Sequence, residues 1–403
     1  MFKPNLEKYL ISTLFLEPNK VSLKQAAESI AAESSIGTWT ELNTLSQNIQ
    51  KKLKAIVFEI NSKTKIIKIA YPLALFEKGS IPQFLSNSAG NIFSMKLVKN
   101  LRLIDVDFPS SYIQSFPGPQ IGKDNIKKIF KVTQNRPLIG LIMKPKLGLN
   151  PKEQANLTYL CFIGGVDLVK DDENLTNQSF NRFEKRVEYC LKAQRRAEKE
   201  TGRIKICVFN ITAETEEMIK RAKLVKKMGG RAIMVDVITA GFAALQTLRK
   251  QNLGLIIHAH RAMHSVITRN KKHGISMLVL AKLLRLAGVD QLHTGTIIGK
   301  MEGGEEDVLK INNFLTSPWA GLKPVLPIAS GGLHPELVPK LMKILGRDII
   351  MNFGGGVHGH PEGTLAGAKA VYQAVEATCQ NIPLKKYAKN HHELSIALEH
   401  FKK

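Results

Sequence analysis

The sequence predicts an α/β protein in which a carboxyl-terminal (β/α)8 barrel follows a smaller α+β domain. Three observations predict the barrel. From about residue 137 of the 403, short β-rich runs alternate with amphipathic helical stretches, eight times over. The β-rich runs are almost continuously apolar, which is typical of parallel strands buried on both faces. Eight such strand–helix units in about 265 residues match the usual size of this barrel.

The predicted strands share a run of apolar residues bounded by turn or polar residues. They are Leu138–Met143, Val166–Lys170, Ile204–Asn210, Ala232–Val237, Leu255–His260, Gln291–Thr296, Val325–Ala329 and Ile349–Phe353. Between them lie helices such as Glu214–Met228, in which Met218, Ala222 and Val225 fall on one face. An open doubly wound sheet is the alternative. The first strand is followed by Lys-Pro-Lys-Leu-Gly and not by a Gly-x-Gly-x-x-Gly motif, which favours the barrel.

Residues 1–120 predict a separate α+β domain of the ferredoxin-like kind, and residues 121–403 predict the barrel domain. In the first domain we expect helices at Leu23–Ala32 and Ile81–Gly90, and strands at Ala55–Ile60 and Ile66–Tyr71. The stretch Phe108–Gly122 is rich in Pro, Gly and Ser, and it marks the junction.

Composition excludes several classes of protein. Hydrophobic residues make up 44% of the chain, which excludes a mostly disordered protein. No apolar run of about 18 residues is free of charge, and the charged start lacks the apolar core of a secretory signal, so we expect a cytoplasmic protein that binds no membrane. Lys and Arg total 58 against 34 acidic residues, a net charge of +24 that would attract polyanions. The lysines are scattered rather than gathered with aromatic residues, so an RNA-binding protein is only an alternative and no nucleic acid partner is expected.

Polar residues follow most of the predicted strands. A barrel carries its active site at the carboxyl ends of its strands, and packing does not explain polar side chains at one end of so many of them. We therefore expect an enzyme. The residues are Lys144 and Lys146, Lys170–Glu173, Asn210, His258, His260, Arg261 and His264, His293, Ser330–Gly332, and Gly354–Gly356.

The tetrapeptide Lys170–Glu173 indicates a metal site. Because side chains alternate along a strand, Lys170 and Asp172 point to one side and Asp171 to the other, while Glu173 can turn inward. Carboxylate oxygens suit Mg²⁺. Lysine cannot bind a metal as an ammonium, but a carbamate made from Lys170 and CO2 would supply an anionic oxygen. A surface acidic turn neutralised by lysine is the alternative for this tetrapeptide alone.

Two glycine clusters indicate a phosphate site. Loops after the seventh and eighth strands of a barrel often bind phosphate through backbone N–H groups, and Gly331–Gly332 and Gly354–Gly356 follow those strands. Arg261 and His293 can donate hydrogen bonds to a second phosphate. The pattern therefore favours a bisphosphate substrate.

Two further motifs have open interpretations. Gly299–Gly304 places glycines around Lys300, which is the composition of a closing lid or of a mobile surface turn. His258 and His260 form a His-x-His pair of the kind that binds zinc. No further His or Asp set completes a zinc site, which disfavours zinc.

These motifs resemble the large subunit of ribulose-1,5-bisphosphate carboxylase/oxygenase (RuBisCO), in order and spacing over nearly the whole chain. The matching segments are ESSIGTWT (33–40), GNIF (90–93), GLIMKPKLGL (140–149), GGVDLVKDDEN (164–174), HAHRAMH (258–264), HTGTIIGKMEG (293–303), ASGGLH (329–334) and FGGGVHGHP (353–361). The resemblance implies that the enzyme carboxylates, and competitively oxygenates, ribulose 1,5-bisphosphate. Its substrates would be this bisphosphate, CO2 and O2, and carboxylation would give two molecules of 3-phosphoglycerate.

The resemblance also implies a metal centre and a set of catalytic side chains. Lys170, carbamylated by an activating CO2, would bind Mg²⁺ with Asp172 and Glu173, and its carbamate would take the C3 proton of the substrate. The other implied catalytic residues are Lys144, which protonates the product carbanion, His260, which assists proton transfers around hydration, Lys300, which stabilises the new carboxylate, and Glu33, which pairs with Lys300 of the neighbouring subunit.

The implied substrate contacts fall into three groups. Arg261 and His293 would hold one phosphate. The other phosphate would lie at Gly332, Gly354, Gly355, Thr38 and Trp39, and Ser330 and Asn91 would contact the sugar backbone. Gly331, Asn352 and Phe353 would also bind the substrate, and Lys146 would tune the pKa of Lys144.

Within the family, residues 181–187 and 268–275 look most like archaeal-type form III enzymes. These need no small subunit, form homodimers or assemblies of dimers, and serve AMP salvage. The chain departs from plant-type enzymes at Ile142, where many have threonine, and in its short tail after Leu394. A RuBisCO-like isomerase that enolises a sugar phosphate without fixing CO2 is the alternative, and it is disfavoured because Lys144, His260, Lys300 and Glu33 are all present.

Overall fold

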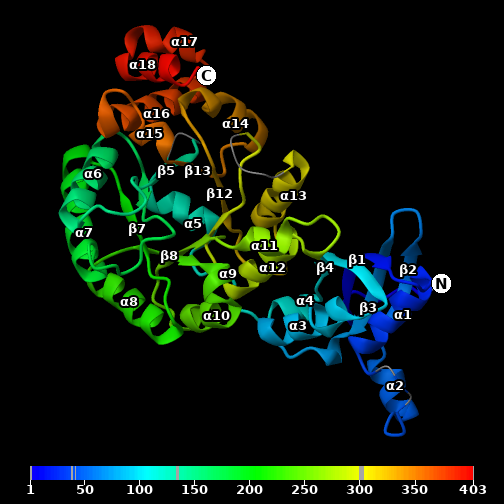
Figure 1. The fold of residues 1–403 in the computed structure, drawn as a ribbon. Helices are drawn as coiled ribbons and strands as arrows, with labels where there is room; N and C mark the ends of the chain where they lie inside the picture. The colour runs from blue at the N-terminus through cyan, green and yellow to red at the C-terminus, as the bar shows by residue number, and fades with distance from the viewer. Residues whose placement is uncertain (1, 38–39, 41, 133–135, 299–303, 403) are drawn as a thin grey trace. The chain divides into compact units, whose positions relative to one another are not determined.

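The computed structural model describes residues 2–402 except 38–39, 41, 133–135 and 299–303 (Figure 1). The chain divides into two compact units. The first comprises Met1–Gly118, Met263–Ala287 and Trp319–Leu322, and the second comprises Pro119–Ala262, Gly288–Pro318 and Lys323–Lys403. Among the described residues, no helix is long and apolar enough to cross a membrane.

The second unit contains a closed barrel of eight parallel strands, which confirms the predicted fold class. Each predicted strand is present, with bounds that differ by at most a few residues. The strands are β5 (Leu138–Ile142), β6 (Leu168–Lys170), β7 (Ile206–Asn210), β8 (Ala232–Asp236), β9 (Ile256–His260), β11 (Gln291–His293), β12 (Leu326–Ser330) and β13 (Ile350–Phe353). They pair in chain order, and β13 closes the barrel against β5.

Helices follow the strands along the chain, as Figure 1 shows for α6, α7 and α8 outside the strands. Local sequence fixes where several of them begin. Asn150 caps α6 in a capping box with Glu153, and the Glu214 carboxylate caps α8. The helices of this unit are α5 (Gly122–Ile129), α6 (Pro151–Ile163), α7 (Phe183–Thr201), α8 (Thr215–Lys227), α9 (Val237–Ala240), α10 (Phe242–Lys250), α13 (Glu305–Thr316), α14 (Val338–Leu345), α15 (Gly355–His358), α16 (Gly363–Cys379), α17 (Leu384–Tyr387) and α18 (His392–His400).

The first unit is built on a five-stranded mixed sheet in the order β10-β4-β1-β3-β2. The predicted elements are present there, but two long strands, β1 and β4, were not predicted. The strands are β1 (Tyr9–Pro18), β2 (Ile56–Asn61), β3 (Ile66–Pro72), β4 (Val98–Asp107) and β10 (Gly274–Ile275). The helices are α1 (Leu23–Glu33), α2 (Gln47–Leu53), α3 (Ile81–Ser88), α4 (Ser110–Ile113), α11 (His264–Thr268) and α12 (Met277–Ala287).

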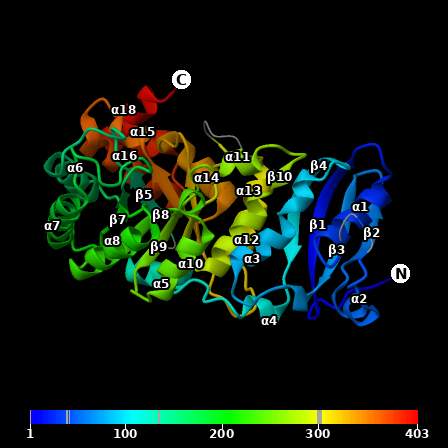
Figure 2. The ribbon, with the colours of Figure 1, turned by 60° about the horizontal axis from the view of Figure 1, so that its bottom comes forward.

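The segment between β9 and β11 joins this sheet rather than the barrel unit. Its short strand β10 pairs in parallel with β4, beside which it lies in Figure 2. Arg102 of β4 is almost fully buried and donates hydrogen bonds to the carbonyl oxygens of Thr268, at 3.0 Å, and Asn270. Lys282 of α12 donates to the carbonyl oxygen of Val106 at 2.7 Å. These bonds hold residues 263–287 to a strand more than 150 residues earlier in the chain.

Apolar side chains from every strand but β11, and from α5, fill the barrel interior. Because side chains alternate along a strand, the residue two positions after each core residue of a strand also faces the interior. The core residues are Ile126, Phe130, Leu138, Leu168, Ile206, Val208, Ala232, Met234, Ile256, Leu326, Ile328 and Ile350.

Buried ion pairs hold together the amino ends of the strands. Asp290, which is fully buried just before β11, accepts four hydrogen bonds. The donors are the backbone N–H groups of Ile121 (2.7 Å), Gly122 (3.0 Å) and Ile257 (3.0 Å), and Arg249 Nη2 (2.6 Å). One carboxylate therefore ties two strands to the segment that leads into α5.

We predict that Asp290→Ala destabilises the barrel strongly, because it leaves the buried Arg249 guanidinium without its ion-pair partner and three backbone donors without an acceptor. Breaking a buried pair costs about 3 kcal/mol or more, whereas Asp348→Ala, which breaks a half-exposed pair with Lys123, should cost about 1 kcal/mol or less. Urea denaturation of both variants measures the difference in the free energy of unfolding. Equal losses in the two variants would contradict this role of Asp290.

Candidate active site

A layer of polar side chains lies above the apolar core, at the carboxyl ends of the strands. Each of its members follows a core residue by two positions and therefore faces the barrel interior. All except the half-buried Ser330 are almost fully buried. The six residues, from β6, β7, β8, β9, β12 and β13, are Lys170, Asn210, Asp236, His258, Ser330 and Asn352.

Lys170, the last residue of β6, is fully buried. Its Nζ donates to the carbonyl oxygen of Asp171 at 2.8 Å and lies 3.3 Å from Met234 Sδ, both uncharged acceptors. Burial lowers the pKa of Lys170 below the ordinary value, although the charges of Glu173 and Asp172 oppose this effect. A lowered pKa favours the neutral amine, which is the form of lysine that reacts with CO2.

Asp172 and Glu173 place two carboxylates beside Lys170. Asp172 is fully buried, and its Oδ2 lies 2.6 Å from Lys144 Nζ. Glu173 Oε1 lies 3.4 Å from Lys146 Nζ, and Glu173 Oε2 lies 3.8 Å from His260 Nε2. Burial raises the pKa of Glu173, but the neighbouring Lys170, His260 and Lys146 side chains and a backbone hydrogen bond outweigh it and hold this pKa well below its usual range. Glu173 is therefore an anion at neutral pH.

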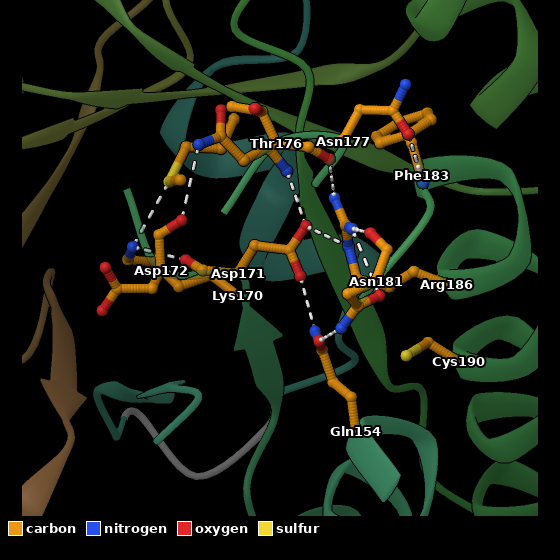
Figure 3. A network of polar contacts seen from close by, with 12 residues as sticks. Gln154, Lys170, Asp171, Asp172, Thr176, Asn177, Asn181, Phe183, Arg186 and Cys190 are labelled. Atoms are coloured by element: carbon orange, nitrogen blue, oxygen red, sulfur yellow. Dashed lines mark hydrogen bonds and ion pairs between the residues drawn. The ribbon is translucent and has the colours of Figure 1, made fainter. Parts of the chain in front are cut away.

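Asp171 points away from this group, as strand alternation predicts, and Figure 3 shows it directed toward Gln154 and Arg186. Its carboxylate accepts hydrogen bonds from Gln154 Nε2 (2.7 Å), Arg186 Nε (3.0 Å) and the Asn210 backbone N–H (2.9 Å). Arg186 is fully buried, so this charge pair is shielded from water. The hydrogen bonds of Asp171 therefore fix the backbone that carries Lys170 and Asp172.

A chain of hydrogen bonds crosses the interior from β9 to β12. Gln291 Oε1 lies 2.7 Å from His258 Nδ1, His258 Nε2 lies 2.8 Å from His293 Nε2, and His293 Nδ1 lies 3.0 Å from Ser330 Oγ. Because Gln291 Oε1 can only accept, His258 carries its proton on Nδ1 and His293 carries its proton on Nε2. Burial holds the pKa of both histidines well below the usual value, so both rings are neutral.

The two histidines of the His-x-His pair do not face a common position at which both could bind one metal ion. His258 faces His293, whereas His260 Nδ1 faces Asp236 Oδ1 at 3.0 Å. Within the described ranges, no group of three or more His, Cys, Asp and Glu side chains could hold a metal ion. The two carboxylates beside Lys170 thus need a further ligand to form a metal centre.

The glycine clusters have the freedom that backbone binding requires. Gly331 and Gly332 have φ values of 124° and 76°, which side-chain-bearing residues rarely adopt. A Cβ at Gly355 would meet nothing within 4 Å, and one at Gly354 would lie 3.6 Å from Lys144 Cε. The loop after β13 therefore lies beside Lys144 and leaves its backbone accessible.

Asn352 and Phe353 end β13 just before this loop. Phe353 is 1% exposed and packs in the core. Asn352 is equally buried, yet neither its Oδ1 nor its Nδ2 has a hydrogen-bond partner among the described residues. An unpaired buried amide is costly, and a bound ligand could satisfy it.

Arg261 follows β9 and is packed against Gly295, where a Cβ would lie 2.5 Å from Arg261 Nη2. Burial lowers the pKa of Arg261 to about 10, so the guanidinium remains charged at neutral pH. Arg261 and His293 stand at the ends of the neighbouring strands β9 and β11.

The remaining predicted residues belong to the first unit or lie outside the described residues. Glu33 and Asn91 both line a polar pocket of about 320 Å³ in the first unit, together with Ser34, Gln83 and Asn87. Thr38, Trp39 and Lys300 lie outside the described residues, as do residues 299–303 of the expected lid.

Asp236 is the polar-layer residue that the sequence analysis did not include. Its carboxylate contacts His260 Nδ1 and lies 3.4 Å from Asn210 Nδ2. No motif marks it, but its position two residues after the core residue Met234 would have identified it.

Comparison with known proteins shows to which family the chain belongs. Residues 1–112 match the family model for the ribulose bisphosphate carboxylase large chain, N-terminal domain, and residues 125–401 match the model for its catalytic domain. The ribulose bisphosphate carboxylase of Methanosarcina mazei is 50% identical over 97% of this chain and 96% of its own length. That of Methanocaldococcus jannaschii is 46% identical over 100% of this chain and 98% of its own length.

Solved structures show the same relationship. The octameric enzyme of Pyrococcus horikoshii has a TM-score of 0.96 and 47% identity, and the match covers 100% of this chain and 95% of that one. A dimeric archaeal enzyme from Hyperthermus butylicus has a TM-score of 0.93 and 44% identity, with 99% and 97% covered. Since both family models match and full-length relatives are up to half identical, the chain belongs to the ribulose bisphosphate carboxylase large-chain family.

Proposed function

We propose that this protein adds CO2 and water to ribulose 1,5-bisphosphate and cleaves the product into two molecules of 3-phosphoglycerate. The observation that carries the proposal is the group at the end of β6, where a fully buried lysine amine lies beside two carboxylates, one of them 2.6 Å from Lys144. The names of full-length relatives support this reaction.

The group at the end of β6 suits Mg²⁺ once Lys170 is carbamylated. Asp172 and Glu173 supply two hard oxygen ligands, and the described residues add no third carboxylate or histidine to them. The Lys170 amine has only uncharged hydrogen-bond acceptors, so conversion to an anionic carbamate breaks no direct ion pair. We propose that an activating CO2 forms this carbamate and that Lys170, Asp172 and Glu173 hold the ion, which supplies Lewis-acid polarisation of the sugar oxygens.

The proposed acid–base residues surround this group. The Lys170 carbamate takes the C3 proton, His260 takes up a proton during hydration, and Lys144 returns a proton to the carbanion left by cleavage. The lysine at position 300 stabilises the new carboxylate, paired with Glu33 of the neighbouring subunit.

The proposed phosphate contacts are Arg261 with His293 at one end of the substrate and the glycine clusters at the other end. Arg261 holds one phosphate through charge-assisted hydrogen bonds, and His293 is the second proposed contact at the same end of the substrate. The backbone of the glycine clusters holds the other, with Thr38 and Trp39. The remaining proposed contacts to the substrate are Lys146, Ser330, Asn91, Asn352 and Phe353.

We further propose that the protein works as a homodimer or an assembly of dimers without a small subunit, oxygenates the same substrate as a side reaction, and serves AMP salvage. The dimeric and octameric archaeal enzymes support the assembly. The direct test of the activity is incorporation of labelled CO2 into 3-phosphoglycerate with ribulose bisphosphate and Mg²⁺. Enolisation of the substrate without incorporation would instead support an isomerase.

We predict that Lys170→Met abolishes turnover while the protein stays folded, because methionine fills the buried volume but cannot form a carbamate. The matched control is Lys205→Met, which removes another fully buried amine, bonded to the carbonyl oxygen of Val166 at the amino end of the barrel. That variant should keep about half of the activity or more, since this end of the barrel serves stability. Preincubation with CO2 and Mg²⁺ followed by the carbon-fixation assay measures both, and turnover by Lys170→Met would refute the metal site.

We predict that Lys300→Ala loses carboxylation but keeps exchange of the substrate C3 proton with solvent, since enolisation precedes the step that this lysine assists. Exchange of tritium from the C3 position, measured beside carbon fixation, separates the two steps. Lys340→Ala, an exposed lysine on α14, is the control and should keep both. Loss of both reactions with intact substrate binding would show that this division of roles is wrong.

We predict that two inactive variants, Glu33→Ala and Lys170→Met, regain activity when their subunits exchange. In a mixed dimer one site receives both intact residues and the other carries both lesions, so random pairing restores about one quarter of the sites. Native mass spectrometry verifies the exchange, and the fixation assay measures recovery. Continued inactivity of a verified mixed dimer would indicate that each site lies within one chain.

A further inference from the structure

Asp236 and His260 are neighbours in the barrel register. They occupy paired positions at the ends of the parallel strands β8 and β9, and both are at least half-buried. His260 Nδ1 lies 3.0 Å from Asp236 Oδ1, whereas His260 Nε2 lies on the side of Glu173, 3.8 Å from its Oε2. The two ring nitrogens therefore face different surroundings, one toward a carboxylate of the strand layer and the other toward the proposed metal group.

The Asp236 carboxylate is held in place by its own partners. Asn210 Nδ2 lies 3.4 Å from Asp236 Oδ2 and also donates to the carbonyl oxygen of Glu173 at 3.1 Å. The Asp236 backbone N–H donates to Thr212 Oγ1 at 2.9 Å. Because Asp236 is only 4% exposed, water does not compete for its oxygens. The acceptor that His260 meets is thus fixed in position.

An ionised carboxylate can only accept, so the 3.0 Å contact requires the proton of neutral His260 to lie on Nδ1. The Ala262 backbone N–H also approaches Nδ1, but at 3.3 Å it is longer and lacks the charge that strengthens the Asp236 bond. With Nδ1 protonated, the Nε2 lone pair faces the interior. A histidine in this tautomer presents the unprotonated Nε2 as its acceptor.

We propose that Asp236 is a positioning residue that fixes the tautomer of His260 and so makes Nε2 the proton acceptor. This inference rests on the proposed function. In the hydration step, His260 Nε2 takes one proton from the attacking water, and the hydroxide oxygen bonds to the substrate carbonyl carbon. The π bond of that carbonyl breaks and its electron pair moves to the carbonyl oxygen, while the Nδ1 proton stays between His260 and Asp236. The proton on Nε2 then passes to solvent before the next turnover.

The first test is Asp236→Asn, which keeps the shape of the side chain but can present an N–H group to Nδ1 and favour the opposite tautomer. We expect kcat for carboxylation to fall about 100-fold, with KM for ribulose bisphosphate within about threefold, because the phosphate contacts are unchanged. Thr239→Val is the matched control. It removes a hydrogen bond to the backbone carbonyl oxygen of Asp236 at 2.9 Å, leaves the carboxylate intact, and should keep kcat. An unchanged kcat in Asp236→Asn would overturn the proposal.

The second test separates positioning from general damage. If Asp236 acts through His260, then Asp236→Asn should lower kcat at most about twofold further in a His260→Gln background. Additive losses, with the full 100-fold appearing again, would show that Asp236 acts independently of His260 and would overturn the proposal.

The third test needs neither substrate nor activity. In wild-type protein labelled with 15N-histidine, the two-bond proton–nitrogen correlations of His260, identified by their loss in His260→Gln, should show Nδ1 protonated and Nε2 unprotonated. Protonation at Nε2 instead would overturn the inference even if Asp236→Asn failed to fold. Since the spectrum is recorded on the free protein, a wild type with the expected tautomer but no carbon fixation would refute the proposed function and leave the tautomer assignment standing.

Discussion

The alternation of side chains in a closed parallel barrel is the constraint on which the rest of the site depends. The side chain of every second residue of each strand points into one shared interior. Because Leu168, Val208 and Met234 lie in the core, the residues two positions later also face the barrel interior. Those residues are polar, and closing the barrel alone brings Lys170 and Asn352 into one layer although 182 positions separate them in the chain. The placement of these side chains is therefore a consequence of the strand register.

A buried polar layer is costly unless its groups are paired, and most of them are. Asp171 is satisfied on the outer side by Arg186 and Gln154, and His258 and His293 satisfy each other. Lys170 and Asn352 differ, because the Lys170 amine meets only uncharged acceptors and the Asn352 amide meets none among the described residues. Lys170 and Asn352 are therefore the groups of the layer with the weakest hydrogen bonding, and they are the ones proposed to take up CO2 and to contact the substrate. A ligand gains most at such groups, because it supplies the missing partners.

The sequence predicted the barrel well and the first unit only in part. All eight barrel strands were predictable because strands buried on both faces need unbroken apolar runs. In the first unit β1 and β4 were missed, and β10 could not have been predicted from local pattern. Strand β10 has only two residues, and its pairing depends on Arg102, more than 150 residues earlier in the chain. Helices and strands follow from short-range periodicity, whereas the choice of which sheet a segment joins depends on contacts that periodicity does not encode.

The same distinction applies within the site. Lys170, Asp172 and Glu173 could be predicted because they are adjacent in sequence and carry recognisable chemistry, whereas Asp236 stands among apolar residues and belongs to no motif. Its importance follows from register alone, since paired inward positions on neighbouring parallel strands must touch, and its partner there is His260. A neutral residue at 236 could fill the same space, but it would lack the carboxylate that accepts the proton of His260 Nδ1. The charge at this position, rather than the fold, is what distinguishes the two nitrogens of the ring.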